Sequence, residues 1–112
     1  MATTTYKRLG AIASSGVIAT ADTLYTVPAA TSSVISTIVI CNTAASAATY
    51  RIAVSTTTSF VATGYIVYGA TVAANDTVFL TIGATLDATN KYLLTSASAS
   101  TVSFSAFGSE IA

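Results

Sequence analysis

The sequence has no histidine and no tryptophan, a single cysteine, and only eight charged residues among 112. One cysteine cannot form an internal disulfide, and without histidine it cannot build the common zinc sites. The formal net charge is zero, so the chain lacks the positive charge with which proteins bind a phosphate backbone, and we expect no nucleic-acid partner. Low charge combined with 53% hydrophobic residues also excludes an intrinsically disordered chain.

Long apolar runs are missing as well. No stretch reaches the roughly 18 apolar residues that a membrane span needs, so we expect no membrane partner. Lys7 and Arg8 precede a mildly apolar stretch at residues 9–21, as in a secretory signal peptide. Polar and glycine residues interrupt that stretch, so we assign it to the folded domain.

Groups for catalysis and metal binding are scarce. Without histidine, a serine nucleophile would need Lys7 or Lys91 as its base, and neither lies in a Ser-x-x-Lys motif. Cys41 ends an apolar run with no basic neighbour, which is typical of an inert buried thiol. The acids fall at expected strand starts or loops and form no Asp-x-Asp cluster for calcium. They are Asp22, Asp76, Asp87 and Glu110. We therefore expect no enzymatic activity, no metal and no cofactor.

The chain is rich in small and β-forming residues, with 22 Ala, 21 Thr and 14 Ser beside many Val, Ile, Tyr and Phe. β-Branched and aromatic side chains pack well on a pleated sheet, whereas the usual helix formers other than alanine are few. Alternation of apolar and polar residues predicts eight short strands. Their ranges are 4–13, 22–27, 33–42, 49–55, 64–70, 77–82, 91–97 and 101–107. Turn signals separate them, among them Gly83-Ala84 and Asp87-Ala88-Thr89-Asn90.

Short strands divided by turns predict an all-β fold. We expect one domain over residues 1–112, built as a single antiparallel β-sandwich of seven to eight strands, jelly-roll or immunoglobulin-like. Residues 1–8 are expected to form an extended N-terminal arm, because chain ends are disordered unless they are tied down. The predicted core comprises Val34 or Ile35, Ile38, Ile40, Ile52, Val54, Val78 or Phe79, Leu80, Leu93 and Phe104.

So little charge on the surface favours association. A folded chain of 11.2 kDa exposes roughly 5,700 Å² of surface. Eight charges spread over this area leave large neutral areas. The candidate partner-contact residues are Tyr6, Lys7, Arg8, Tyr65 and Tyr68. The odd spacing of the last two puts them on opposite faces of a strand, so one is expected to enter the core while the other faces out. Closed symmetry is usual for such assemblies, and we expect a homotrimer.

Five segments together resemble small virion structural proteins of tailed bacteriophages, including those of cyanophages. They are LYTVPA at 24–29, VISTIVICN at 34–42, YRIAV at 50–54, ANDT at 74–77 and VSFSAFGSEI at 102–111. The resemblance implies a capsid decoration or cement protein on the outer capsid surface of the virion. It also implies the major capsid protein and further copies of the chain as partners, and it brings no catalytic residues.

Two alternatives remain open. The first is a tail, baseplate or fibre component of the same kind of particle. The second belongs to another class of protein: a carbohydrate-binding β-sandwich module, which would bind sugars through tyrosines on a sheet face.

Overall fold

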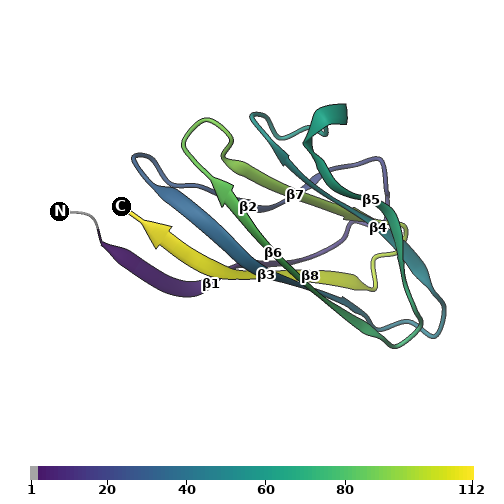
Figure 1. Ribbon diagram of the computed structural model, residues 1–112. Helices are drawn as coiled ribbons and strands as arrows, with labels where there is room; N and C mark the ends of the chain where they lie inside the picture. The colour runs from purple at the N-terminus through teal and green to yellow at the C-terminus, as the bar shows by residue number, and fades with distance from the viewer. Residues whose placement is uncertain (1–2) are drawn as a thin grey trace.

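The computed structural model describes residues 3–112 and contains two packed β-sheets (Figure 1). The strands are β1 (Thr4–Ala13), β2 (Asp22–Thr26), β3 (Ser32–Asn42), β4 (Ala48–Ser55), β5 (Tyr65–Val72), β6 (Thr77–Leu86), β7 (Tyr92–Ala97) and β8 (Val102–Ile111). A single turn of 3₁₀ helix, η1 (Ala62–Gly64), precedes β5. Between residues 3 and 112, no helix has the length and apolar character needed to cross a bilayer. The predicted all-β sandwich of eight strands is confirmed.

The strand order makes the sandwich a jelly roll. One sheet, which we call the front sheet, has the order β1-β8-β3-β6, and the back sheet has the order β2-β7-β4-β5. The antiparallel pairs β1–β8, β2–β7, β3–β6 and β4–β5 alternate between the sheets, as in a long hairpin of eight strands rolled over on itself. The immunoglobulin-like alternative is therefore wrong.

The core lies between the two sheets and is centred on β3. Among the predicted core residues, six side chains have no exposed surface. They are Ile35, Ile38, Ile40, Ile52, Leu93 and Phe104. Burying a side chain of this size stabilises the fold by about 1.5–3 kcal/mol. Val54, Val78 and Leu80 are half-buried and pack against this core. Phe79 is the wrong member of its predicted pair, because it points away from the back sheet and is 71% exposed.

β-Bulges account for the error in the β6 prediction. Gly83 and Ala84, predicted as a turn, lie inside β6, which continues to Leu86. The register between β6 and β3 shifts at this point, and Gly83 has a φ of +60°, which favours glycine. The chain therefore kinks at Gly83 and stays in the sheet.

The N-terminal segment is part of the front sheet. Residues 4–8 pair with β8, from Thr4 opposite Ile111 to Arg8 opposite Phe107. The predicted arm over residues 1–8 is therefore wrong for residues 4–8, because their backbone groups are hydrogen-bonded to a neighbouring strand. Residues 1 and 2 lie outside the described part of the chain.

Asn42 holds together three loops at one end of the sandwich. This side chain is 1% exposed. Its Nδ2 donates to the carbonyl oxygens of Ser46 and Ala73 at 2.8 and 3.3 Å. Its Oδ1 accepts from the Ala44 amide at 3.1 Å and the Thr101 hydroxyl at 3.2 Å. One buried amide therefore satisfies groups in the β3–β4, β5–β6 and β7–β8 connections.

We expect the substitution Asn42→Asp to destabilise the protein by about 3 kcal/mol. Aspartate keeps the shape of the side chain but replaces both donors with a buried carboxylate that faces two carbonyl oxygens. The free energy of unfolding in urea measures the effect. Asn75→Asp, at an exposed turn position, is the matched control and should change stability by less than about 0.5 kcal/mol. Equal losses in the two variants would contradict this role of Asn42.

Candidate functional site

The side of the front sheet that points away from the back sheet is uncovered. Beside the part of β8 from Ser103 to Ser109, the strand register and the alternation of side chains place sixteen residues on this side, which we call the outer face. They are Tyr6, Arg8, Ala11 and Ala13 of β1; Ser103, Ser105, Phe107 and Ser109 of β8; Val34, Thr37, Val39 and Cys41 of β3; and Thr77, Phe79, Thr81 and Thr85 of β6. The outer face thus spans all four strands of the front sheet.

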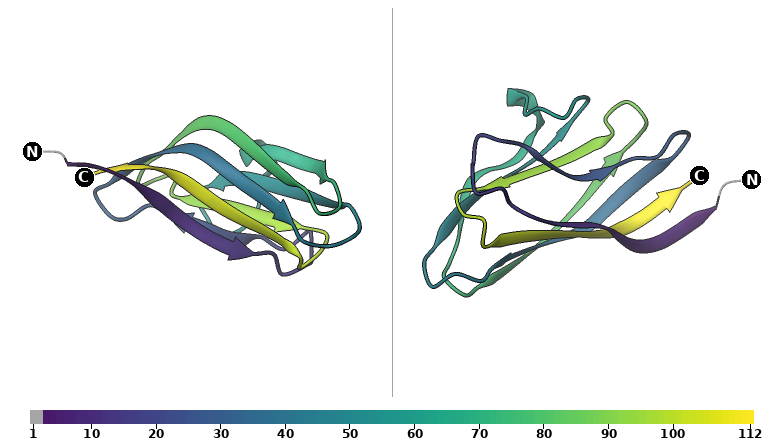
Figure 2. Two further views of the ribbon diagram at one scale, coloured as in Figure 1. Left: turned by 90° about the horizontal axis from the view of Figure 1, so that it is seen from below. Right: turned by 180° about the vertical axis from the view of Figure 1, so that it is seen from behind.

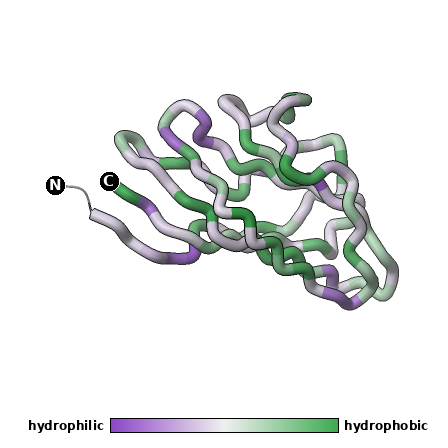
Figure 3. The backbone as a smooth tube through the Cα atoms, in the orientation of Figure 1, coloured by the Kyte–Doolittle hydropathy of each residue, from purple (hydrophilic) through white to green (hydrophobic). Residues whose placement is uncertain are grey.

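Aromatic side chains and a near absence of charge characterise the outer face. Tyr6 is 82% exposed and Phe107 is 39% exposed, and with Phe79 they form three exposed aromatic positions among small and hydroxyl side chains. Arg8 is the one charged residue among the sixteen. Figure 3 shows strongly hydrophilic positions at only a few places along the described residues 3–112. The outer face is therefore nearly uncharged, with separate aromatic side chains that a partner could cover.

Part of the corresponding side of the back sheet, around β7, is covered by the chain itself. Ala53, Leu94 and Ser96 point away from the front sheet, yet none has exposed surface. The Ser96 hydroxyl donates to the carbonyl oxygen of Ile18 at 2.7 Å, so the connection between β1 and β2 lies over this sheet. The right-hand view of Figure 2 shows that dark segment crossing the back of the molecule. The part of the back sheet around β7 is thus covered, whereas its β5 edge stays open at Tyr68, which is 65% exposed.

The five predicted contact residues do not come together. Tyr6 and Arg8 lie on the outer face, at the β1 edge of the front sheet. Lys7 lies between them in sequence but points toward the inside of the sandwich. Tyr65 and Tyr68 lie on β5, an edge of the back sheet.

Tyr65 and Tyr68 form an aromatic cluster with Phe60. The ring centroids of Tyr65 and Tyr68 are 4.8 Å apart, and those of Phe60 and Tyr65 are 5.3 Å apart. The Arg51 guanidinium lies 4.3 Å from the centre of the Tyr68 ring, which is 65% exposed. The prediction that the two tyrosines lie on opposite faces is wrong, because the β4–β5 register shifts at Ile66 and rotates the strand.

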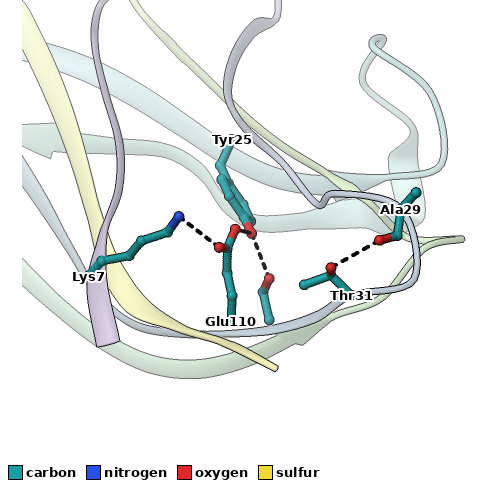
Figure 4. Close-up of polar contacts among 6 residues, drawn as sticks. Lys7, Tyr25, Ala29, Thr31 and Glu110 are labelled. Atoms are coloured by element: carbon teal, nitrogen blue, oxygen red, sulfur yellow. Dashed lines mark hydrogen bonds and ion pairs between the residues drawn. The ribbon is translucent and has the colours of Figure 1, made fainter. Parts of the chain in front are cut away.

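A polar network joins the two sheets at the end of the sandwich opposite Asn42 (Figure 4). Lys7 Nζ lies 2.7 Å from Glu110 Oε1. The Tyr25 hydroxyl donates to Glu110 Oε2 at 2.5 Å and lies 2.7 Å from the Ser33 hydroxyl. Tyr25 belongs to the back sheet and the other three residues to the front sheet. Glu110, predicted at a strand start or loop, lies within β8, and its carboxylate links strands from both sheets.

The network shifts the pKa values of both acidic groups. The hydrogen bond from Lys7, followed by that from Tyr25, holds the pKa of Glu110 below its ordinary value. Burial, followed by the hydrogen bond to Glu110, raises the pKa of Tyr25 from 10.0 to about 12. The Glu110 contribution to stability is therefore present above its ordinary pKa and is lost as the pH falls through the lowered one. Lys7, Tyr25, Ser33 and Glu110 thus form a structural link between the two sheets, which we call the clasp.

No groups of the usual catalytic or metal-binding kind gather elsewhere in residues 3–112. This part of the chain contains no cluster of three His, Cys, Asp or Glu side chains that could hold a metal. It also forms no enclosed pocket.

Phe79 and Phe107 are the outer-face residues that sequence reasoning missed. The signal was present, because Phe79 alternates with Val78 and Leu80 and so shares a side with Thr77 and Thr81. Along β8, Phe107 alternates with the buried Ala106 and therefore lies on the same side of the strand as Ser103 and Ser105.

Comparison with known proteins identifies the fold and no family. No protein-family model matches the sequence, and no curated protein matches it. Among solved structures, the chain is similar to a chain in the structure of the Gx strain of infectious bursal disease virus, with a TM-score of 0.50 and 12% identity. The alignment covers 98% of this chain and 31% of that one. At this identity the likeness shows the fold alone. Nearly the whole sandwich recurs there, as about a third of a chain in a virus structure.

We expect the free energy of unfolding to fall as the pH rises from about 10 to 12. The unfolded chain loses the Tyr25 proton near 10.0, whereas the folded protein holds it to about 12, so deprotonation favours unfolding in this window. Tyr25→Phe should remove much of this decline, and Tyr6→Phe, at an exposed position, should leave it unchanged. Urea unfolding at several pH values measures the slope. Equal slopes for wild type and Tyr25→Phe would show that the hydroxyl of Tyr25 is not the group responsible.

Proposed function

We propose that this chain is a structural protein of a virus particle. More specifically, we propose a decoration or cement protein of a tailed bacteriophage, which binds the outer surface of the capsid and has no catalytic activity. The resemblance of the sequence to tailed-phage virion proteins supports this proposal. The jelly-roll fold supports it by analogy, because such sandwiches occur in viral capsid and lectin domains. The observation that carries it is the uncovered, nearly uncharged outer face.

The size of the outer face suits a protein partner. Four strands spaced about 4.8 Å apart, each with about ten residues rising about 3.3 Å, span roughly 600 Å². A standard interface buries about 800 Å² on each partner. Contacts around the rim of the sheet can supply the difference.

The chemistry of the outer face also suits a stable contact. Aromatic residues are enriched among the residues that contribute most to binding, and charged residues are depleted from interface cores. Phe107 lies near the middle of the front sheet, with Tyr6 and Phe79 on its two edge strands. Covering this area desolvates a single charge, that of Arg8. The proposed partner is therefore a capsid subunit with an apolar and hydroxyl-rich surface.

A carbohydrate-binding module is the second candidate function, and the aromatic cluster favours it. Exposed tyrosine rings stack on sugar faces, and Tyr68 is exposed beside the Arg51 guanidinium. A tail, baseplate or fibre component would use the same outer face against a different virion protein. The two contact surfaces lie on different sheets, so single substitutions can separate the functions.

We expect Phe107→Ser to weaken attachment of the chain to capsids. Serine suits this position, because the neighbouring outward positions Ser103 and Ser105 of β8 already carry it. Loss of an aromatic contact near the centre of an interface costs about 1–2 kcal/mol, or roughly 5- to 30-fold in affinity. Cosedimentation of the purified chain with capsids that lack it measures the change.

Tyr68→Ser is the matched control, since it also replaces an exposed aromatic residue, but on the back sheet. The proposal predicts that this variant attaches to capsids as wild type does. Both variants should show a cooperative thermal unfolding transition, which establishes that each is folded. Loss of attachment in Tyr68→Ser combined with normal attachment of Phe107→Ser would contradict the capsid-binding role of the outer face. Binding of glycans by wild type but not by Tyr68→Ser would then support the carbohydrate-binding alternative.

A further inference from the structure

The four edge strands of the sandwich differ in how well they are protected against pairing with another strand. Natural proteins protect exposed edges with charges, bulges, short strands and proline. β1 has a bulge after Arg8, and it carries that charge together with the inward-pointing Lys7. β2 has only five residues, begins at Asp22 and is followed closely by Pro28. Both of these edges therefore carry protecting features.

β5 is protected by its shape. Its register with β4 shifts twice, and Gly69 has a φ of +73°, so the strand twists away from a regular ladder. The rings of Tyr65 and Tyr68 also pack together beside this edge. A flat partner strand would not match this backbone.

β6 lacks all of these features over residues 77–81, which we call the free segment. The free segment pairs with β3 in unbroken register, from Thr77 opposite Cys41 to Thr81 opposite Thr37. Its sequence, TVFLT, contains no charge and no proline. The bulge in β6 begins only after Thr81.

The free segment presents both backbone groups and an aromatic ring to a partner. In an antiparallel ladder, alternate residues turn their N–H and C=O groups to opposite sides, so about two or three residues of the free segment point theirs away from β3. Phe79, in the middle, is 71% exposed. A strand added at this edge would satisfy the backbone groups and cover part of the ring.

We propose that the free segment pairs with the same segment of a second copy of this chain. The two strands run antiparallel about a two-fold axis at Phe79, and the two front sheets become one continuous sheet. This dimer replaces the trimer expected from the sequence, because pairing of identical edges is isologous and closes at two copies. The inference concerns self-association and stands without the proposed function.

The free segment is complementary to itself. Pairing about Phe79 sets Val78 opposite Leu80 and Thr77 opposite Thr81, so aliphatic residues meet on one side and hydroxyls on the other. Cross-strand aromatic and hydroxyl pairs of this kind stabilise sheets, whereas like charges directly opposite destabilise them.

Charge does not oppose the pairing. The nearest charged residue in sequence is Asp76, which precedes the free segment. Its two copies in the dimer would lie six residue positions apart, or about 20 Å. That separation exceeds the Debye length of about 8 Å at physiological salt. The net charge of the whole chain is zero, so there is no long-range repulsion between copies.

Analytical ultracentrifugation of the full chain from 10 µM to 1 mM tests this inference without any capsid. We expect wild-type protein to approach twice its mass of 11.2 kDa as its concentration rises. Phe79→Lys should weaken dimerisation by at least 30-fold, because it places two ammonium groups next to each other at the axis. Tyr6→Lys is the control: it also adds a lysine at an exposed aromatic position of the outer face, but on the protected edge, and it should dimerise like wild type.

Disulfide trapping tests the same register if Phe79→Lys fails to fold. In a Cys41→Ser background, Phe79→Cys should form a covalent dimer rapidly on mild oxidation, and Tyr6→Cys should not. A wild-type chain that stays monomeric at 1 mM, a trimer, or a dimer that Phe79→Lys leaves intact would overturn the inference. Because no capsid is present, any of these results would leave the test with Phe107→Ser unaffected.

Discussion

The alternation of side chains along β3 determines both the core and the outer face of the front sheet. β3 lies inside the front sheet, paired on both sides, and it points Ile35, Ile38 and Ile40 into the core. A bulge between Ile35 and Thr37 offsets the alternation by one residue, and Thr37 and Val39 then point outward. A strand that buries one side completely must present its other side to whatever lies beyond the sheet. The core and the outer face are thus two consequences of one pattern.

The chain has few charges, and two of them lie in the polar network between the sheets. Glu110 uses its charge in the clasp with Lys7 and Tyr25, where it joins the two sheets at one end. A neutral amide, that of Asn42, closes the other end. The other six charges are spread over the rest of the chain. The β1–β2 connection covers part of the outward side of the back sheet, around β7. The outer face, with Arg8 as its one charged residue, is a large and nearly uncharged area.

Most of the fold could be predicted from the sequence, because period two is a local property of each strand. β1 was predicted with its observed bounds, and the isoleucines of β3 were placed correctly in the core. The bulges could not be predicted, because an extra residue depends on the partner strand as well as on its own strand. The turn assigned at Gly83 and the opposite faces assigned to Tyr65 and Tyr68 failed for this reason.

The clasp and the outer face needed the three-dimensional structure. Tyr25 and Glu110 are 85 residues apart in sequence, and only the rolled topology brings their side chains together. The cover over β7 comes from the β1–β2 connection, which has no regular alternation, so sequence patterns alone could not show which part of the sheets would be covered.

The proposed contact between the outer face of the front sheet and a capsid subunit can be observed directly. The most direct measurement is a cryo-EM reconstruction, at a resolution that separates strands, of a particle that carries this chain. We expect β1, β8, β3 and β6 to face the capsid, with Phe107 in contact and the back sheet toward solvent. A reconstruction with the front sheet in solvent and the aromatic cluster of Phe60, Tyr65 and Tyr68 against the capsid would contradict it.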